Sequence, residues 1–255
     1  MSAETVTKIK LTERPKAKSA FPIGHCPGCH YGNIIRLIAE NIDELEIGGR
    51  TILLGGVGCS YAWPYQFDLD GTPCPHGRAP AMATALKRIH PDCILITCQG
   101  DGDLGAIGLG CFMNALQRAE LLTTIFLNNA GYGMTGGQMA PTTLVGQVTT
   151  TSPRGREVEV AGYPIHVAEI VSQFKGVAYS ARHTVHTPAN YQRAKKAVKI
   201  ALQKQIDGIG YSFIEFLSAC PASWRMNPKE CLNFISEKMI PEYPLGEFKN
   251  VDKIE

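Results

Sequence analysis

One group of residues suited to chemistry follows two apolar runs of strand length. Asp101 comes just after Cys93–Cys98, in Gly100-Asp101-Gly102, and Asn128-Asn129 follow Leu122–Leu127. With a helix expected over 105–119, these runs form a strand, helix, strand unit, which brings both strand ends to one sheet edge. Carboxylate, amide and main-chain oxygens are ligands for Mg²⁺ or Ca²⁺, and the glycines leave backbone N–H groups open to a phosphate. Taken alone, Gly-Asp-Gly is equally typical of an ordinary turn.

Four cysteines form a second group. Cys26-Pro-Gly-Cys29 has the spacing with which two thiolates hold one metal centre, and on its own it suits zinc, an iron-sulfur cluster or thiol redox chemistry. Cys59 and Cys220 each follow a predicted strand, so they can converge with this hook at one edge of the sheet. The alternatives are a zinc hook or a bare turn for Cys26 and Cys29, and a core thiol for Cys220. The other cysteines are interpreted as packing residues: Cys74, Cys93, Cys98, Cys111 and Cys231.

Helices and strands alternate along most of the chain. Apolar residues at helical spacing predict helices over 31–45, 79–89, 105–119, 167–174 and after the Thr187 cap. Apolar runs predict strands over 51–54, 93–98, 122–127, 177–181 and 211–217, and 99–103 is expected to be a loop. The Pro-rich tail is expected to hold at most one short helix, near 228–239. This alternation predicts an α/β fold with a parallel sheet covered by helices on both faces.

Length and composition fit one large domain and exclude several classes of protein. The 255 residues, 44% hydrophobic and 19% charged, can build a sizeable core, which excludes intrinsic disorder. A net charge of +2 provides no large excess of positive charge for binding nucleic acid. No apolar run approaches the roughly 20 residues of a bilayer span. Met1–Ser19 is charged without an apolar core, so we expect no secretory signal, no membrane insertion and a cytoplasmic location. Nine cysteines, an odd number, argue against a disulfide framework there.

Taken together, the motifs resemble those of a known enzyme family. Gly100-Asp101-Gly102, then 25 residues, then Asn128-Asn129 is similar to the cofactor motif of thiamine diphosphate enzymes, and Gly131–Gln138 continues the match. With the cysteines, the pattern resembles the thiamine diphosphate-binding β subunit of 2-oxoacid:ferredoxin oxidoreductases over nearly the whole chain, including Pro75–Ala79. The chain departs from that family at His30-Tyr31, directly after the hook, where small residues are expected.

The resemblance implies a thiamine diphosphate-binding fold, its cofactors and their ligands. Mg²⁺ on Asp101, Asn129 and the main-chain carbonyl of Gly131 would anchor the diphosphate, and His76 is the expected catalytic residue, with a core histidine as the alternative. A 4Fe-4S cluster would be held by Cys26, Cys29, Cys59 and Cys220. The other residues expected at the cofactor are Gly58, Cys59, Ser60, Gly100, Gly102, Asp103, Tyr132, Gly133, Met134 and Thr135.

The resemblance also implies an organisation of domains and subunits. We expect an extended arm over 1–20, a diphosphate-binding (PP) domain with the iron-sulfur site over 21–220, and a tail over 221–255 that packs on the domain or on a partner. A separate pyrimidine-domain (α) subunit is implied, with ferredoxin-like or other electron-transfer subunits. A basic set on the helix after Thr187 forms either a solvated face or a dock for an acidic partner: Arg193, Lys195, Lys196, Lys199 and Lys204.

The implied activity is oxidative decarboxylation of a 2-oxo acid with coenzyme A, giving an acyl-CoA, CO₂ and a reduced carrier. Two alternatives remain: a subunit of a thiamine diphosphate decarboxylase without redox chemistry, and a zinc-stabilised binding module. A nicotinamide enzyme is disfavoured, because no G-x-G-x-x-G follows the first predicted strand. The segments 142–151 and 241–246 look most like the branched-chain 2-oxoisovalerate type, with pyruvate, 2-oxoglutarate and phenylglyoxylate open.

Overall fold

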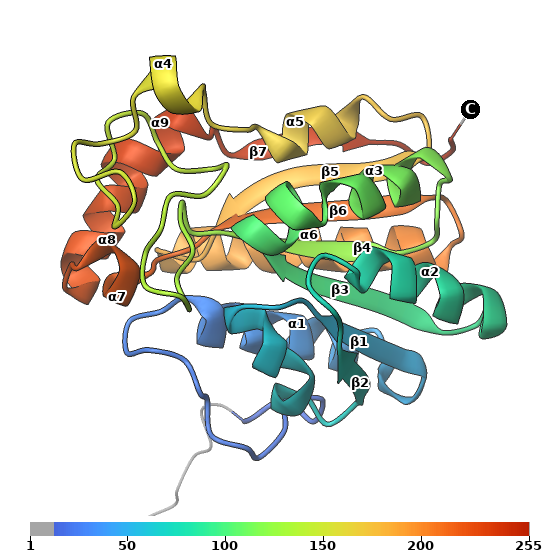
Figure 1. The fold of residues 1–255 in the computed structure, drawn as a ribbon. Coiled ribbons are helices and arrows are strands. Elements are labelled where there is room, and N and C mark those ends of the chain that lie inside the picture. The colour runs from blue at the N-terminus through green and yellow to red at the C-terminus, as the bar shows by residue number, and fades with distance from the viewer. Residues whose placement is uncertain (1–12, 255) are drawn as a thin grey trace, which may run out of the picture.

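A single sheet runs through the protein and brings the carboxyl ends of its parallel strands to one edge. The computed structural model describes residues 13–254, in which seven strands are ordered β2-β1-β3-β4-β6-β5-β7 (Figure 1). Neighbouring strands are parallel except for β5 and β7, which are antiparallel. The strands are β1 (Thr51–Gly55), β2 (Asp70–Pro73), β3 (Ile94–Gly100), β4 (Thr123–Asn128), β5 (Val177–Thr184), β6 (Tyr211–Leu217) and β7 (Gly246–Asn250).

Helices cover both faces of this sheet, as Figure 1 shows. On one face lie α1 (Tyr31–Glu44) and α6 (Pro188–Ile206); on the other lie α2 (Ala79–Ile89), α3 (Leu109–Gln117) and α5 (Val167–Ser172). The remaining helical segments are η1 (Gly48–Arg50), η2 (Cys59–Gln66), η3 (Asp103–Ile107), α4 (Val158–Ala161), α7 (Pro221–Trp224), α8 (Pro228–Phe234), η4 (Ile235–Met239) and α9 (Ile240–Glu242). The predicted α/β fold with a doubly covered sheet is therefore confirmed, although β7 makes the sheet mixed.

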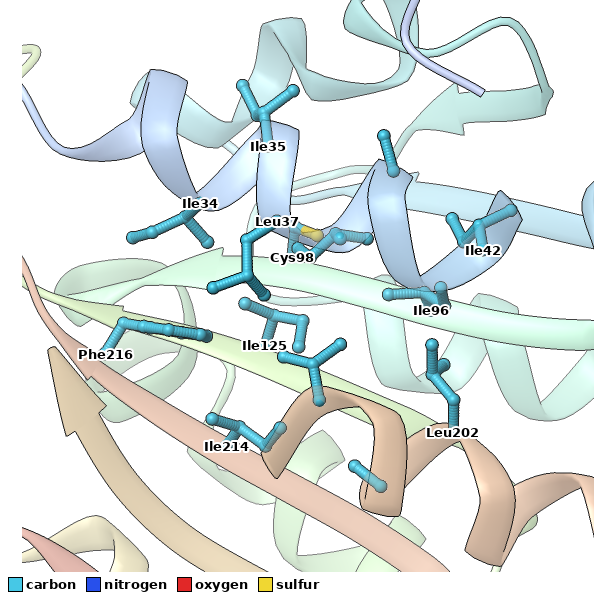
Figure 2. Close-up of a cluster of buried hydrophobic side chains, with 14 of the residues drawn as sticks. Ile34, Ile35, Leu37, Ile42, Ile96, Cys98, Ile125, Leu202, Ile214 and Phe216 are labelled. Carbon is cyan, nitrogen blue, oxygen red and sulfur yellow. The ribbon is translucent and has the colours of Figure 1, made fainter. Parts of the chain in front are cut away.

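The central strands are apolar on both faces because each face packs against helices. Ile125 and Ile214 contact the α1 and α6 side, where Leu37 and Leu202 meet them (Figure 2). Phe126 and Phe213 alternate with these residues and pack on the opposite side. Burial on both faces explains why these strands appear in the sequence as continuous apolar runs.

The tail differs most from the sequence-based expectation. It forms α7, α8, η4 and α9 and then β7, which pairs with β5, where at most one short helix was predicted. The prolines begin helices here: Pro221 and Pro228 occupy first-turn positions, where a missing N–H costs nothing. Asn227 and Glu230 form a reciprocal capping box at the start of α8. The prediction failed because prolines were interpreted as breaks.

The segment 99–103 was also predicted wrongly, as a loop. Gln99 and Gly100 belong to β3, and helical structure begins at Asp101 without an intervening loop. Asp101 therefore stands in a first helical turn, whose backbone N–H groups lack intrahelical partners. Of the predicted arm over 1–20, residues 1–12 lie outside the described residues. In the part that is described, the main-chain nitrogens of Lys16 and Ala17 donate to the Asp43 carboxylate.

Within residues 13–254, none of the helices combines the length and apolar character needed to cross a bilayer.

The aromatic layer between the sheet and α3 gives a stability prediction. Phe213 is fully buried, with ring centroids 5.5 Å from Phe112 and 6.0 Å from Phe126. Phe213→Ala should lower the free energy of unfolding by about 3–5 kcal/mol, because it leaves a cavity among these rings. Val160→Ala, at a side chain that is 80% exposed, should change it by less than about 0.5 kcal/mol. Urea denaturation measures both, and equal effects would contradict the packing described.

Candidate active site

A pocket opens at the carboxyl ends of β1, β3 and β4, where ligands bind in open α/β sheets. Every residue predicted at the cofactor lines it except Ser60, which is buried and donates its hydroxyl to the Gly56 carbonyl at 3.1 Å. Two lining residues, Tyr31 and Val57, were missed. For Tyr31 the signal was present in the sequence, as the large residue that follows the cysteine hook.

Asp101 is the buried acid at the centre of this pocket. It is only 2% exposed, and its Oδ2 accepts hydrogen bonds from the main-chain nitrogens of Gly131 (2.9 Å) and Asn129 (3.2 Å). Burial raises the pKa of the Asp101 carboxyl to about 8, and these hydrogen bonds offset only part of the effect. A cation beside the carboxylate would supply the missing countercharge.

Asn129 and Gly131 place further oxygen ligands next to Asp101. The Asn129 amide atom that faces the site lies 3.0 Å from Asp101 Oδ2 and 2.6 Å from the Gly131 carbonyl oxygen. As nitrogen, this atom would donate to both oxygens. As oxygen, it lies at two separations close to those between neighbouring ligands around Mg²⁺ at ~2.0–2.1 Å. The donor set therefore fits a hard cation.

The loop carrying these ligands is held in a strained conformation by buried polar contacts. Ala130, between Asn129 and Gly131, has φ of 55°, a left-handed value that costs free energy for a residue with a Cβ. Its nitrogen donates to Asn128 Oδ1 at 3.1 Å, and Asn128 donates to Glu215 Oε1 at 2.7 Å. Glu215 in turn pairs with Arg182 at 3.0 Å, both fully buried. The Trp224 indole donates to the Asn129 carbonyl at 2.9 Å, so the tail also supports the loop.

Asp103, two residues further along, is occupied by the protein's own donors. Its Oδ1 accepts from the main-chain nitrogens of Val57 (2.8 Å) and Gly77 (2.9 Å) and lies 2.6 Å from His76 Nδ1. Its Oδ2 accepts from Gln99 Nε2 at 2.5 Å. Asp103 lines the pocket as predicted, but it ties the segments after β1 and before α2 to the sheet. Because both of its oxygens already accept hydrogen bonds, the Asp103 carboxylate holds the pocket walls in place and is not suited to bind an anionic phosphate.

His76 stands at the edge of the same pocket. Its side chain is 40% exposed, and Asp103 fixes one ring nitrogen and with it the ring orientation. The other ring nitrogen is left for a ligand. This arrangement contradicts the alternative of a core histidine.

The four predicted cysteine ligands gather beside Asp101. Burial, with a smaller contribution from charge on neighbouring cysteines, Cys59 and Cys26 among them, raises the pKa of Cys29 to about 12 and that of Cys220 to about 11. An ideal Cβ at Gly133 would lie 3.0 Å from Cys220 Sγ and 3.8 Å from Cys59 Sγ, so the loop after β4 passes directly over two sulfurs. Metal binding would replace the thiol protons.

No group of three or more His, Cys, Asp or Glu side chains in residues 13–254 is arranged to hold a metal ion. The Asp101 set does not fall under that description, because two of its ligands are an amide and a main-chain carbonyl. The four sulfurs are close enough to influence one another's pKa values.

The basic set on α6 is largely neutralised by ion pairs. Lys195 pairs with Glu40 (3.0 Å) and Glu44 (2.7 Å), Lys199 pairs with Glu44 (3.2 Å), and Lys204 pairs with Asp252 (2.7 Å). These contacts favour the interpretation of a structural face over that of a dock for an acidic partner.

The sequence of this chain is similar to those of known proteins. Residues 56–216 match the family described as "Thiamine pyrophosphate enzyme, C-terminal TPP binding domain". The ketoisovalerate oxidoreductase subunit VorA of Methanothermobacter thermautotrophicus is 42% identical over 238 residues, 93% of this chain and 50% of that protein. The 2-oxoglutarate synthase subunit KorB of Archaeoglobus fulgidus is 34% identical over 217 residues, covering 85% of this chain and 77% of that protein. The chain thus spans about half the length of the VorA relatives it matches.

A solved structure shares the fold. A chain of the 2-oxoglutarate:ferredoxin oxidoreductase from Magnetococcus marinus superposes with a TM-score of 0.74 at 24% identity, over 98% of this chain and 89% of the other.

The Asp103 contacts give a prediction for the pocket walls. Asp103→Asn replaces one acceptor with an N–H₂ group that must face existing donors, so it should lower the free energy of unfolding by about 3 kcal/mol. Asp92→Asn, at an exposed position, should have almost no effect. Thermal and urea unfolding compare the two variants, and an Asp103→Asn protein as stable as the wild type would show that these hydrogen bonds do not hold the walls.

Proposed function

Since this chain belongs to the thiamine pyrophosphate enzymes and, among them, to the family of 2-oxoacid:ferredoxin oxidoreductase subunits, we propose that it is the thiamine diphosphate-binding catalytic subunit of such an enzyme. The reaction is RCOCOO⁻ + CoASH → RCO-SCoA + CO₂ + H⁺ + 2e⁻, with the electrons passing to a ferredoxin-type carrier. The observation that carries the proposal is the meeting of Asn129 from the cation site with the sulfurs of Cys59 and Cys220 at one glycine, Gly133, on the carboxyl edge of the sheet.

Thiamine diphosphate and Mg²⁺ would bind at the Asp101 pocket. The oxygens of Asp101, Asn129 and Gly131 suit the cation, and the first helical turn after β3 offers N–H groups to the diphosphate. Gly102 must lack a side chain, because a Cβ there would collide with the Tyr132 ring. Bound thiamine diphosphate supplies the electron sink that lets a 2-oxo acid lose CO₂.

A 4Fe-4S cluster would be held by Cys26, Cys29, Cys59 and Cys220. Such a cluster binds each thiolate through a different iron, whereas a single zinc ion would draw all four sulfurs to about 2.3 Å from one point. The mutual influence of the four cysteines, together with the family to which the chain belongs, supports the cluster. When bound by these cysteines, a 4Fe-4S cluster would supply one-electron redox chemistry beside the Asp101 pocket.

The chain's own residues would orient the reactants and exclude water. His76, fixed by Asp103, would present its second ring nitrogen to a ligand at the pocket mouth, where it can hold or pass on a proton. Tyr31, Val57 and Cys59 close the inner wall. Coenzyme A would enter from the open side.

A partner subunit would close the remaining side of the pocket. Met134 lines the pocket and is 59% exposed, and Val148 and Val145 on the nearby loop are also exposed. Apolar side chains grouped around a site mark an interaction surface. We assign this surface to the pyrimidine-domain subunit, with electron-transfer subunits completing a complex in the cytoplasm.

A branched-chain 2-oxo acid is the substrate we propose. The residues of 13–254 that line the pocket include no Arg or Lys, so this chain offers no cation to the second carboxylate of 2-oxoglutarate. The 42% identity to the VorA subunit, named for ketoisovalerate, supports the same choice.

Separate variants should remove the two cofactors independently. In the anaerobically purified complex, Cys29→Ser should abolish the electron paramagnetic resonance signal of the reduced cluster and retain thiamine diphosphate. Asp101→Asn should retain the iron signal and weaken Mg²⁺ and thiamine diphosphate binding by roughly 100-fold, since it removes the only charged ligand of the cation. Cys111→Ser on α3 is the matched control and should lose neither. A wild-type complex with thiamine diphosphate but no iron would favour a decarboxylase without redox chemistry; zinc without either would favour a binding module.

Substrate preference is measured with the reconstituted complex, coenzyme A and a viologen acceptor. We expect kcat/KM for 2-oxoisovalerate to exceed that for 2-oxoglutarate by roughly 100-fold or more, because a second carboxylate would be desolvated without a cationic partner. Equal values for the two acids would contradict the assignment.

A further inference from the structure

Tyr31 occupies the boundary between the cysteines and the cation site. It is the first residue of α1, and its main-chain nitrogen donates to Cys29 Sγ at 3.5 Å. An ideal Cβ at Gly100 would lie 3.9 Å from the Tyr31 hydroxyl oxygen, so the hydroxyl stands against the start of the Gly100-Asp101-Gly102 segment. The side chain lines the pocket although it is only 2% exposed.

Two aromatic neighbours fix the direction of this side chain. The His25 ring meets the Tyr31 ring edge to face at 5.2 Å between centroids, and the Trp63 ring does so from another side at 5.8 Å. A phenol held between two rings has little freedom to turn its hydroxyl elsewhere. The hydroxyl position is therefore set before any ligand arrives, as specificity requires.

The hydroxyl is a donor that lacks an acceptor. Within residues 13–254 the Tyr31 hydroxyl forms no hydrogen bond, and because the side chain lines the pocket, the hydroxyl is open to a ligand there. A phenol hydroxyl can donate one hydrogen bond, so a ligand oxygen that enters the pocket beside Gly100 is the partner that this position offers.

We propose that Tyr31 is a specificity-determining residue, whose hydroxyl donates a hydrogen bond to an oxygen atom of the bound 2-oxo acid. This inference rests on the proposed function, because it requires a 2-oxo acid to bind between the cysteines and the cation. The inference gives a role to Tyr31, one of the two residues after the cysteine hook at which the chain departs from the family pattern. The competing acceptors are a cluster sulfur and a diphosphate oxygen, and the test separates the three.

The test uses Tyr31→Phe in the anaerobic complex loaded with cofactors. This variant keeps the ring between His25 and Trp63 and removes only the donor. Binding is measured by calorimetry with a methyl acylphosphonate, an analogue in which a phosphonate ester replaces the carboxylate of the 2-oxo acid. We expect roughly tenfold or more weaker binding of this probe, the loss expected for a hydrogen bond to an anionic acceptor. KM for the 2-oxo acid should rise more than kcat falls.

Two further readouts should stay at their wild-type values: the dissociation constant of thiamine diphosphate and the midpoint potential of the cluster. Tyr65→Phe, at a tyrosine that is 56% exposed, is the control and should change none of the measurements. Unchanged probe binding in Tyr31→Phe would overturn the inference. So would an effect confined to the midpoint potential, which would assign the hydroxyl to the cluster, or one confined to thiamine diphosphate. A wild-type complex that binds no thiamine diphosphate would instead overturn the proposed function.

Discussion

The structure depends on the direction of its strands. In a parallel sheet every strand ends at the same edge, so residues that follow β1, β3, β4 and β6 meet there although they are far apart in the sequence. This constraint brings Cys59, Asp101, Asn129 and Cys220 together. The helices on both faces bury the apolar strands and hold that edge rigid. The antiparallel strand β7 lies at the margin of the sheet, next to β5, away from the convergence.

Asp101 and Asp103 have different roles in the site, although they are only two residues apart. Asp103 holds the pocket walls in place, and Asp101 is available to a ligand. Asp103 receives hydrogen bonds from the surrounding main chain and from Gln99, and it contacts His76, so its charge is satisfied within the protein. Asp101 is equally buried, yet its neighbours include the carbonyl oxygen of Gly131 and an Asn129 amide that can turn its own oxygen inward. With the Asn129 oxygen turned inward, a cation would satisfy all three oxygens at once. The strained Ala130 turn, braced through Asn128 and Glu215, presents them.

The sequence predicted what depends on local periodicity and on strand direction. The α2 bounds and the strand over 211–217 agree with the structure, and the residues predicted at the cofactor line one pocket apart from Ser60, although Tyr31 and Val57 were missed. Three-dimensional packing decided the rest. The role of Asp103 depends on main-chain groups from two segments that are distant in the sequence. The structure of the tail depends on helix capping and on the pairing of β7 with β5, and neither leaves a strong apolar pattern in the sequence. Tyr31 was visible as a departure, but its contact with Gly100 required coordinates.

In the function proposed for this chain, one edge of one sheet holds both an electron-accepting centre and thiamine diphosphate. The most direct measurement is an experimental structure of the anaerobically purified complex with thiamine diphosphate and Mg²⁺. We predict a 4Fe-4S cluster bonded to Cys26, Cys29, Cys59 and Cys220, and a cation bound by Asp101, Asn129 and the Gly131 carbonyl. A map with the diphosphate elsewhere, or with a single zinc ion among the four sulfurs, would contradict the claim.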